Sequence, residues 1–134
     1  MRDYLLDTNI WSDWYNPQKN TYILRRLENE LSVRLHISVI TWGELQYGYE
    51  ALTQREKRQL GNIWEFVHGQ APKTVEIDKH VAGDYGKIRA RLFERFGPKE
   101  RKKKGLRPEQ LVDPVTSLQL KIQENDLWIV AQAI

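Results

Sequence analysis

Short apolar runs alternate along the chain with longer amphipathic segments, and this alternation predicts strands and helices in turn. The apolar runs are at residues 4–6, 35–40 and 74–77, and the second is rich in β-branched residues, as in a strand buried on both faces. Two helical patterns follow each of the first two runs, and further helical patterns follow the third. We therefore expect an α/β fold in which a parallel sheet lies between layers of helices.

Polar residues at the predicted boundaries indicate where several helices begin and end. Thr41 is expected to start the helix after the second strand, and Thr53 and Glu56 have the spacing of a capping box. Asp78 is the expected N-cap of a long helix, which Gly97 ends. The inward stripe of that helix is expected to consist of its regularly spaced apolar residues, Val81, Tyr85, Ile88, Leu92 and Phe96.

Three acidic residues stand where an apolar run gives way to a predicted helix. They are Asp7 in YLLDTNI, Glu44 in ISVITWGEL and Asp126 in ENDLWIVAQAI. Because the carboxyl ends of parallel strands meet at one edge of a sheet, carboxylates that are far apart in the sequence can converge there. We expect these three side chains to form a cation site.

The charge of such a cluster limits what it can bind. Two carboxylates about 5 Å apart repel each other by roughly 3 kcal/mol at an effective dielectric constant near 20, so an ionised cluster needs a cation. Oxygen ligands, in a chain without cysteine and without paired histidines, favour Mg²⁺ or Mn²⁺ over zinc. A divalent ion of this kind activates water and neutralises charge on a phosphoryl oxygen, which is the chemistry of phosphodiester hydrolysis.

Each acid also has a simpler interpretation as part of a helix cap. Asp7 can accept a hydrogen bond from a first-turn amide, and Glu44 can reach back to Thr41 in a capping box. Asn125 can be the cap of the last helix, with Asp126 after it as an acid that the helix dipole favours. For each residue alone, capping is the more economical interpretation. The placement of all three at one predicted sheet edge favours the cation site.

Positive charge is concentrated in one short tract. Residues 99–104 (KERKKK) carry a net charge of +4, whereas the whole chain has a net charge of +3. The remaining residues therefore have a net charge of −1. The tract lies in a segment, residues 97–124, that is rich in proline and glycine and reads as an inserted basic loop. Such a tract suits contacts with phosphates, or it is a solvated loop. The candidate contacts are Arg101, Lys102, Lys103 and Lys104, and Arg89, Arg91 and Arg95 of the preceding helix either join them or form an ordinary solvated helix face.

The composition fits one domain over residues 1–134. The chain is 40% hydrophobic with five tryptophans, which is enough for a core, and it has no cysteine for a disulfide or a thiolate nucleophile. Its apolar runs are too short for a signal peptide or a membrane span, so we expect a cytoplasmic protein. Nucleotide-binding glycine loops and serine-hydrolase motifs are absent from the sequence. The histidines, His36, His68 and His80, lack metal-ligand spacing.

The three acidic segments together resemble the motifs of a known family. LLDTNI, ISVITWGEL and NDLWIVAQA, in this order, are similar to the three acidic motifs of PIN-domain proteins, and specifically of VapC-type toxin ribonucleases. The resemblance implies that Asp7, Glu44 and Asp126 are metal-binding and catalytic acids. It also implies Mg²⁺- or Mn²⁺-dependent endonucleolytic cleavage of RNA and inhibition by a cognate antitoxin. The segment 97–124 makes the gap between the second and third acids longer than in that family, and its basic tract either extends the RNA-binding surface or is a disordered tether.

Members of that family continue past the third motif into a further strand with a fourth acidic residue. This chain ends two helical turns after Asp126, so we expect it to be truncated at its C-terminus, with its terminal strand missing. Exposed sheet edge and helix surface would then favour a homodimer. Two alternatives to the ribonuclease remain open at this stage. One is a catalytically impaired binding protein that engages antitoxin or RNA, and the other is a nuclease directed at DNA.

Overall fold

The computed structural model describes residues 1–30, 32–97 and 107–134. The chain divides into two compact units, Met1–Glu76 and Ile77–Ile134, each of which is described by itself. The candidate RNA-binding residues of the basic tract, Arg101, Lys102, Lys103 and Lys104, lie outside the described residues.

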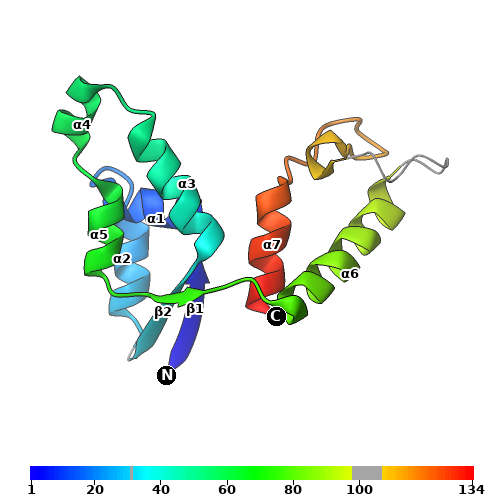
Figure 1. The fold of residues 1–134 in the computed structure, drawn as a ribbon, viewed down its shortest axis with the longest axis horizontal. Coiled ribbons are helices and arrows are strands. Elements are labelled where there is room, and N and C mark those ends of the chain that lie inside the picture. Colours follow the sequence, from blue (N-terminus) through cyan, green and yellow to red (C-terminus); the bar gives the residue numbers. More distant parts are fainter. Residues whose placement is uncertain (31, 98–106) are drawn as a thin grey trace. The chain divides into compact units, whose positions relative to one another are not determined.

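The first unit contains a parallel sheet of three strands. In the order in which they pair, these are β1 (Arg2–Leu6), β2 (Val33–Ser38) and β3 (Lys73–Val75) (Figure 1). β1 pairs with β2 so that Arg2 is opposite Val33 and Leu6 is opposite Ile37. β2 pairs on its other side with β3, where Ser38 is opposite Val75. The α/β fold with a parallel sheet, expected from the hydrophobic pattern, is confirmed.

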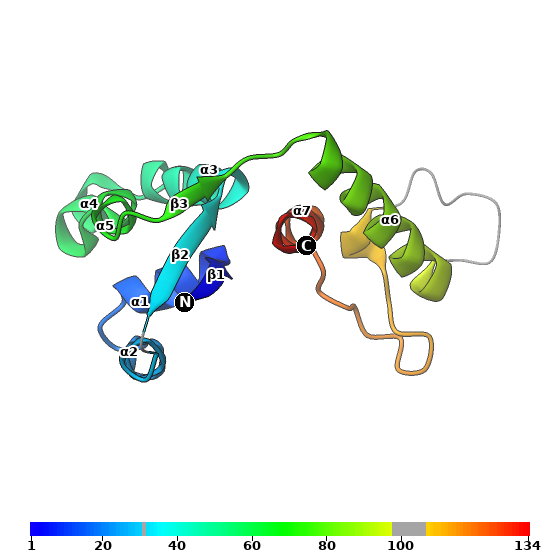
Figure 2. The same ribbon diagram turned by 90° about the horizontal axis from the view of Figure 1, so that it is seen from below.

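Five helices connect these strands. α1 (Thr8–Tyr15) and α2 (Thr21–Glu28) follow β1, and α3 (Val39–Glu50), α4 (Gln54–Leu60) and α5 (Ile63–Gly69) follow β2. The prediction of two helices after the second strand is therefore wrong, because Gly61, with a φ of 72°, ends α4 before α5 begins. Figure 2 shows the same elements from below, with β2 between β1 and β3. The crossovers in this unit are therefore helical, as parallel strands require.

The second strand ends earlier than the apolar run predicts. β2 stops at Ser38, whose hydroxyl accepts a hydrogen bond from the Ile40 amide at 3.0 Å, so that α3 begins at Val39. The prediction that Thr41 starts this helix is therefore wrong. The β-branched residues of this run extend past the end of the strand into the first turn of the helix. The boundary is set by the buried Ser38, which caps α3. Thr53 and Glu56 form the expected capping box of α4.

The core of the first unit forms where the sheet meets α1, α3 and α5. Trp11, Ile37, Leu45 and Val67 are buried there, and Trp11 stacks on Trp14 with ring centroids 5.3 Å apart. Partly buried aromatic residues surround this cluster, including Trp42, Trp64 and Phe66. Burial of these aromatic rings, together with the aliphatic side chains, stabilises the unit.

The second unit packs two helices against each other. α6 (Lys79–Phe96) begins at its N-cap Asp78, which accepts hydrogen bonds from the His80 and Val81 amides, as expected. It ends at Gly97, where any Cβ would collide with the Phe93 carbonyl oxygen. The remaining elements are the 3-10 helix η2 (Pro108–Gln110), an isolated bridge between Val112 and Gln119, and α7 (Glu124–Ala133).

The buried side chains of this second unit come from both helices and the segment between them. Phe93, Leu111, Leu127 and Ala131 are each at most 5% exposed. The expected stripe of α6 omitted Phe93, which is its most buried residue, because the position of α7 selects the inward face. No helix among the described residues is long and apolar enough to cross a bilayer.

Candidate functional site

Asp7 lies immediately after β1 and caps α1. Its Oδ1 accepts a hydrogen bond from the Ile10 amide at 2.9 Å, and the side chain is exposed. The capping interpretation of Asp7 is therefore realised. The Asp7 carboxylate can still bind other groups, because it offers about four acceptor positions and the capping bond uses one of them. The cap also fixes the direction of the second oxygen.

Glu44 is held by the residue next to Asp7. The Thr8 hydroxyl donates to Glu44 Oε1 at 2.7 Å and lies 3.3 Å from the Thr41 hydroxyl, which is fully buried. Thr8 has one hydroxyl proton, and the shorter bond to the carboxylate takes it, so Thr41 donates to Thr8. The first and second acidic motifs are thus joined by a side-chain hydrogen bond across 36 positions of the sequence.

This contact corrects the capping interpretation of Glu44. α3 begins at Val39 with Ser38 as its cap, so Glu44 lies in the second turn and not at a capping-box position. Its carboxylate accepts a hydrogen bond from Thr8 of α1 and not from the Thr41 cap. The half-buried Glu44 therefore faces the start of α1, beside the carboxyl ends of β1 and β2.

Asp126 lies in the first turn of α7, in the second unit. Its Oδ2 accepts a hydrogen bond from the Gln123 amide at 2.9 Å in a capping box, so a capping role is realised here too. Asp126 is exposed, and its position relative to the first unit stays outside what the structure describes.

The start of α7 is fastened to α6 and η2 through Glu124. Arg89 of α6 donates to both carboxylate oxygens of Glu124, at 2.8 and 2.7 Å, and to the Tyr85 hydroxyl at 2.7 Å. The Glu124 amide donates to Glu109 Oε1 at 2.8 Å, and this bond holds the pKa of Glu109 below its ordinary value. Trp128 stacks on Tyr85 with ring centroids 3.7 Å apart. Glu124 is thus held by both its side chain and its backbone, two residues before Asp126.

The contacts of Arg89 indicate a structural role and not a contact with phosphate. The sequence offers Arg89, Arg91 and Arg95 either as phosphate contacts or as a solvated helix face, but the Arg89 side chain is only 29% exposed and is engaged by Glu124. The residues that sequence reasoning missed are Glu124 and Glu109, since nothing in their spacing shows which cation or amide they meet. Arg91 and Arg95 are exposed, as expected of a polar helix face.

The donor set around Asp7 and Glu44 suits a hard divalent cation. The side-chain atoms that make these hydrogen bonds are carboxylate and hydroxyl oxygens, and oxygens are the ligands that Mg²⁺ and Mn²⁺ prefer. Within either unit, the described residues gather no group of three or more histidine, aspartate or glutamate side chains that could hold a metal ion. Convergence of Asp7, Glu44 and Asp126 on one ion therefore stays a prediction.

Two of the three histidines make specific contacts in the first unit. His36 Nε2 lies 3.1 Å from Asp3 Oδ1, and this hydrogen bond is the main reason that the pKa of Asp3 falls below its ordinary value. Arg34 also pairs with Asp3, at 2.8 Å. His68 packs against Trp64 with ring centroids 4.4 Å apart. These contacts are structural, in keeping with the absence of metal-ligand spacing.

A groove opens beside Thr8 and Glu44. Its volume is about 910 Å³, and α1, α3 and the segment through α4 to Ile63 supply its walls. Aromatic and aliphatic side chains dominate the lining, among them Tyr15, Tyr49 and Leu60. The acidic site is therefore next to a concave and largely apolar surface.

A comparison with protein families matches the PIN domain over residues 4–134. This chain belongs to the PIN-domain family. PIN domains are generally nucleases, and they generally use divalent metal ions. A comparison with curated proteins finds no match.

Three solved structures have the same fold. One is a crystal structure of VapBC2 from Rickettsia felis bound to a DNA fragment from the VapBC2 promoter. It is 22% identical in sequence to this PIN domain, with a TM-score of 0.64, and the match covers 100% of this chain and 80% of the other. The second is FitAB bound to an IR36 DNA fragment, 25% identical with a TM-score of 0.62, over 99% and 78%. The third is FitAcB from Neisseria gonorrhoeae, 24% identical with a TM-score of 0.57, over 99% and 80%.

Proposed function

We propose that this PIN domain is the toxin of a toxin–antitoxin pair and a metal-dependent endoribonuclease. The observation that carries the proposal is the hydrogen bond from Thr8 to Glu44, which brings the first two acidic motifs of a nuclease family together at the carboxyl ends of β1 and β2. Membership of the PIN family supports nuclease chemistry, and the oxygen donors support Mg²⁺ or Mn²⁺ as the cofactor.

In this proposal Asp7, Glu44 and Asp126 are the metal-binding and catalytic acids. The capping bonds of Asp7 and Asp126, and the Thr8 bond of Glu44, each hold one carboxylate oxygen and so orient the other. Oriented carboxylates bind a cation more tightly because less side-chain freedom is lost on binding. The ion, when bound, supplies an activated water and stabilises charge on the scissile phosphate.

An antitoxin partner is supported by the structural neighbours, which are toxin–antitoxin complexes. The groove beside Glu44 fits such a partner, because its apolar lining can bury an inserted side chain and its neighbouring acids can pair with a cation. Occupation of this groove would exclude RNA from the acids. A homodimer and a cytoplasmic location belong to the same proposal.

The second candidate is a PIN-like binding protein with impaired catalysis. It is favoured by one observation, namely that Asp7 and Asp126 both make the hydrogen bonds of ordinary helix caps. In that case the acids serve α1 and α7 alone, and the chain engages antitoxin or RNA without cutting it. A nuclease directed at DNA is the third candidate, because the acids themselves do not distinguish the sugar.

The experiment compares cleavage of matched RNA and DNA oligonucleotides with Mg²⁺, with Mn²⁺ and with EDTA. We expect cleavage of RNA only, which EDTA abolishes and Asp7→Asn abolishes. Asparagine caps a helix as well as aspartate does, so this variant keeps the fold. Asp78→Asn is the matched control, because Asp78 caps α6 as Asp7 caps α1. Unchanged cleavage by Asp7→Asn would overturn the proposal, and cleavage of DNA alone would favour the third candidate.

A further inference from the structure

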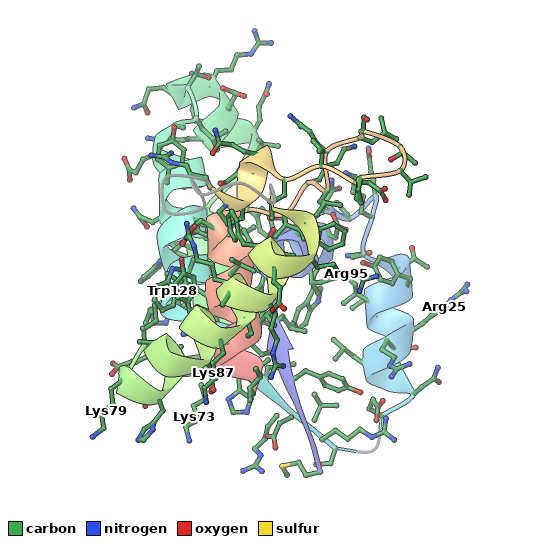
Figure 3. All side chains as sticks on the ribbon, turned by 90° about the vertical axis from the view of Figure 1, so that its right-hand side faces the viewer. Arg25, Lys73, Lys79, Lys87, Arg95 and Trp128 are labelled. Carbon is green, nitrogen blue, oxygen red and sulfur yellow. The ribbon has the colours of Figure 1, made fainter. Side chains whose placement is uncertain are left out.

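The exposed face of α6 consists almost entirely of cations and small residues. Within this helix the exposed charged residues are Lys79, Lys87, Arg91 and Arg95, with Glu94 as the one acid. Figure 3 looks onto α6 and labels Lys79, Lys87 and Arg95 along its length. The other exposed positions hold one histidine and four small residues, His80, Ala82, Gly83, Gly86 and Ala90.

Three of these cations follow one another along the helix and Lys79 lies two turns before them; we call the four the α6 ridge (Lys79, Lys87, Arg91 and Arg95). Lys87, Arg91 and Arg95 follow one another at intervals of four residues, so they are neighbours on the helix surface, about 6 Å apart along the axis. With Lys79 the ridge extends over about 24 Å. Like charges held this close repel one another, and a polyanion that neutralises them gains the most from their alignment.

The ridge charges are not neutralised within the described part of the chain. None of the four forms an ion pair with a described residue, and Arg95 lies over the Phe96 ring at 5.3 Å. Arg89, by contrast, belongs to the packed side of α6 and is committed to Glu124. The helix therefore separates one structural arginine from four cations that are available to a partner.

The chemistry of this face favours a nucleic-acid backbone over a protein. Protein interfaces depend on buried aromatic or large apolar anchors, and the exposed face of α6 offers none. Alanine and glycine beside the ridge leave room for a strand of phosphates to approach the helix. The face also has no exposed asparagine or glutamine that could read base edges.

We propose that the α6 ridge binds the phosphodiester backbone of the RNA substrate without reading its base sequence. This inference rests on the proposed function for the identity of the substrate, and it adds a binding surface outside the acidic site. The contact is electrostatic, so it weakens steeply with salt.

The test measures binding of a labelled single-stranded RNA by fluorescence anisotropy in EDTA, so that no cleavage occurs. The variant is the triple substitution Lys87→Gln, Arg91→Gln and Arg95→Gln in the full chain. Glutamine keeps helix propensity close to that of lysine and arginine, and circular dichroism checks the fold. The matched control removes three exposed cations from α2 and α4 that also lack ion pairs among the described residues, namely Arg25→Gln, Arg55→Gln and Arg58→Gln.

We expect the ridge variant to bind RNA at least about tenfold more weakly at low salt, with the slope of log K against log salt reduced by about 2 for three cations. The control triple should keep both the affinity and the slope. Equal losses in the two triples would overturn the inference, because they would reflect net charge alone. Unchanged RNA binding by the ridge variant would overturn it too. So would a ridge variant that keeps RNA binding and loses only the binding of a labelled acidic peptide, measured in the same way. The readout is independent of cleavage, so failure of the nuclease proposal would be seen separately in the Asp7→Asn comparison.

Discussion

The Arg89 and Glu124 pair is the contact whose energetic weight can be worked out most fully from the structure. One guanidinium nitrogen, Arg89 Nη1, lies 2.7 and 2.8 Å from the two carboxylate oxygens, and the side chains are 29% and 35% exposed. We predict that Arg89→Met destabilises the chain, because it leaves the half-buried Glu124 carboxylate and the Tyr85 hydroxyl without their donor.

The magnitude follows from opposing contributions. Unit charges about 4 Å apart attract by about 4 kcal/mol at an effective dielectric constant of 20. Partial desolvation and the ordering of two long side chains offset most of this, and exposed pairs retain about 0.2–1 kcal/mol. With a charge-assisted bond that is shared between the two carboxylate oxygens, and with only a third of each side chain exposed, we expect Arg89→Met to cost about 1–2 kcal/mol, of which about 1 kcal/mol is coupling to Glu124.

The assay is a double-mutant cycle followed by urea unfolding. It compares the free energy of unfolding of the parent chain, Arg89→Met, Glu124→Gln and the double variant. Arg91→Met is the matched control, because Arg91 lies on the exposed face of α6 without an ion pair among the described residues, and it should change stability by no more than about 0.5 kcal/mol. A coupling energy indistinguishable from zero, or an equal cost for Arg91→Met, would refute the reasoning.

Two further predictions concern helix caps. Ser38→Ala removes the buried hydroxyl that accepts from the Ile40 amide and should cost about 1–2 kcal/mol in urea unfolding, whereas equal stability would mean that Ser38 does not start α3. Because the Glu124 amide lowers the pKa of Glu109, the stability that Glu109 contributes is present above the ordinary glutamate pKa and is lost as pH falls below it. Thermal melts across this acidic range should therefore show a smaller loss of stability in Glu109→Gln than in the parent, and identical pH profiles would contradict the prediction.

Element order was predictable from the sequence because it depends on local patterns. Apolar periodicity located the strands and most helices, and side-chain capping correctly placed the starts of α4 at Thr53 and α6 at Asp78. It missed the break at Gly61, which separates α4 from α5. The boundary between β2 and α3 was misplaced, because β-branched residues run through it and the decisive feature is the single hydroxyl of Ser38. Periodicity also could not identify Phe93 as the most buried residue of α6, since that depends on where α7 lies.

The candidate site was predictable only as a set of residue types at expected strand ends. The contacts around those residues could not be predicted. Thr8 meets Glu44, and Arg89 meets Glu124 two residues before Asp126, in each case across more than 30 positions of the sequence. No local pattern specifies such meetings. The capping interpretations, which local patterns do specify, were right for Asp7 and wrong for Glu44. At the third motif Asp126 lies in the first turn of α7, as the dipole interpretation expects, but the cap is Gln123 and not Asn125.

The measurement that tests the central claim most directly is a calorimetric titration of Mn²⁺ into the full chain and three variants, Asp7→Asn, Glu44→Gln and Asp126→Asn. Asp113→Asn is the control, because Asp113 also accepts backbone hydrogen bonds in the second unit but belongs to none of the acidic motifs. If the three acids hold a common ion, each of the three variants should bind Mn²⁺ at least about tenfold more weakly than the parent, and the control should bind it equally well. Parent-like Mn²⁺ binding by Asp126→Asn would contradict a site shared by positions 7, 44 and 126.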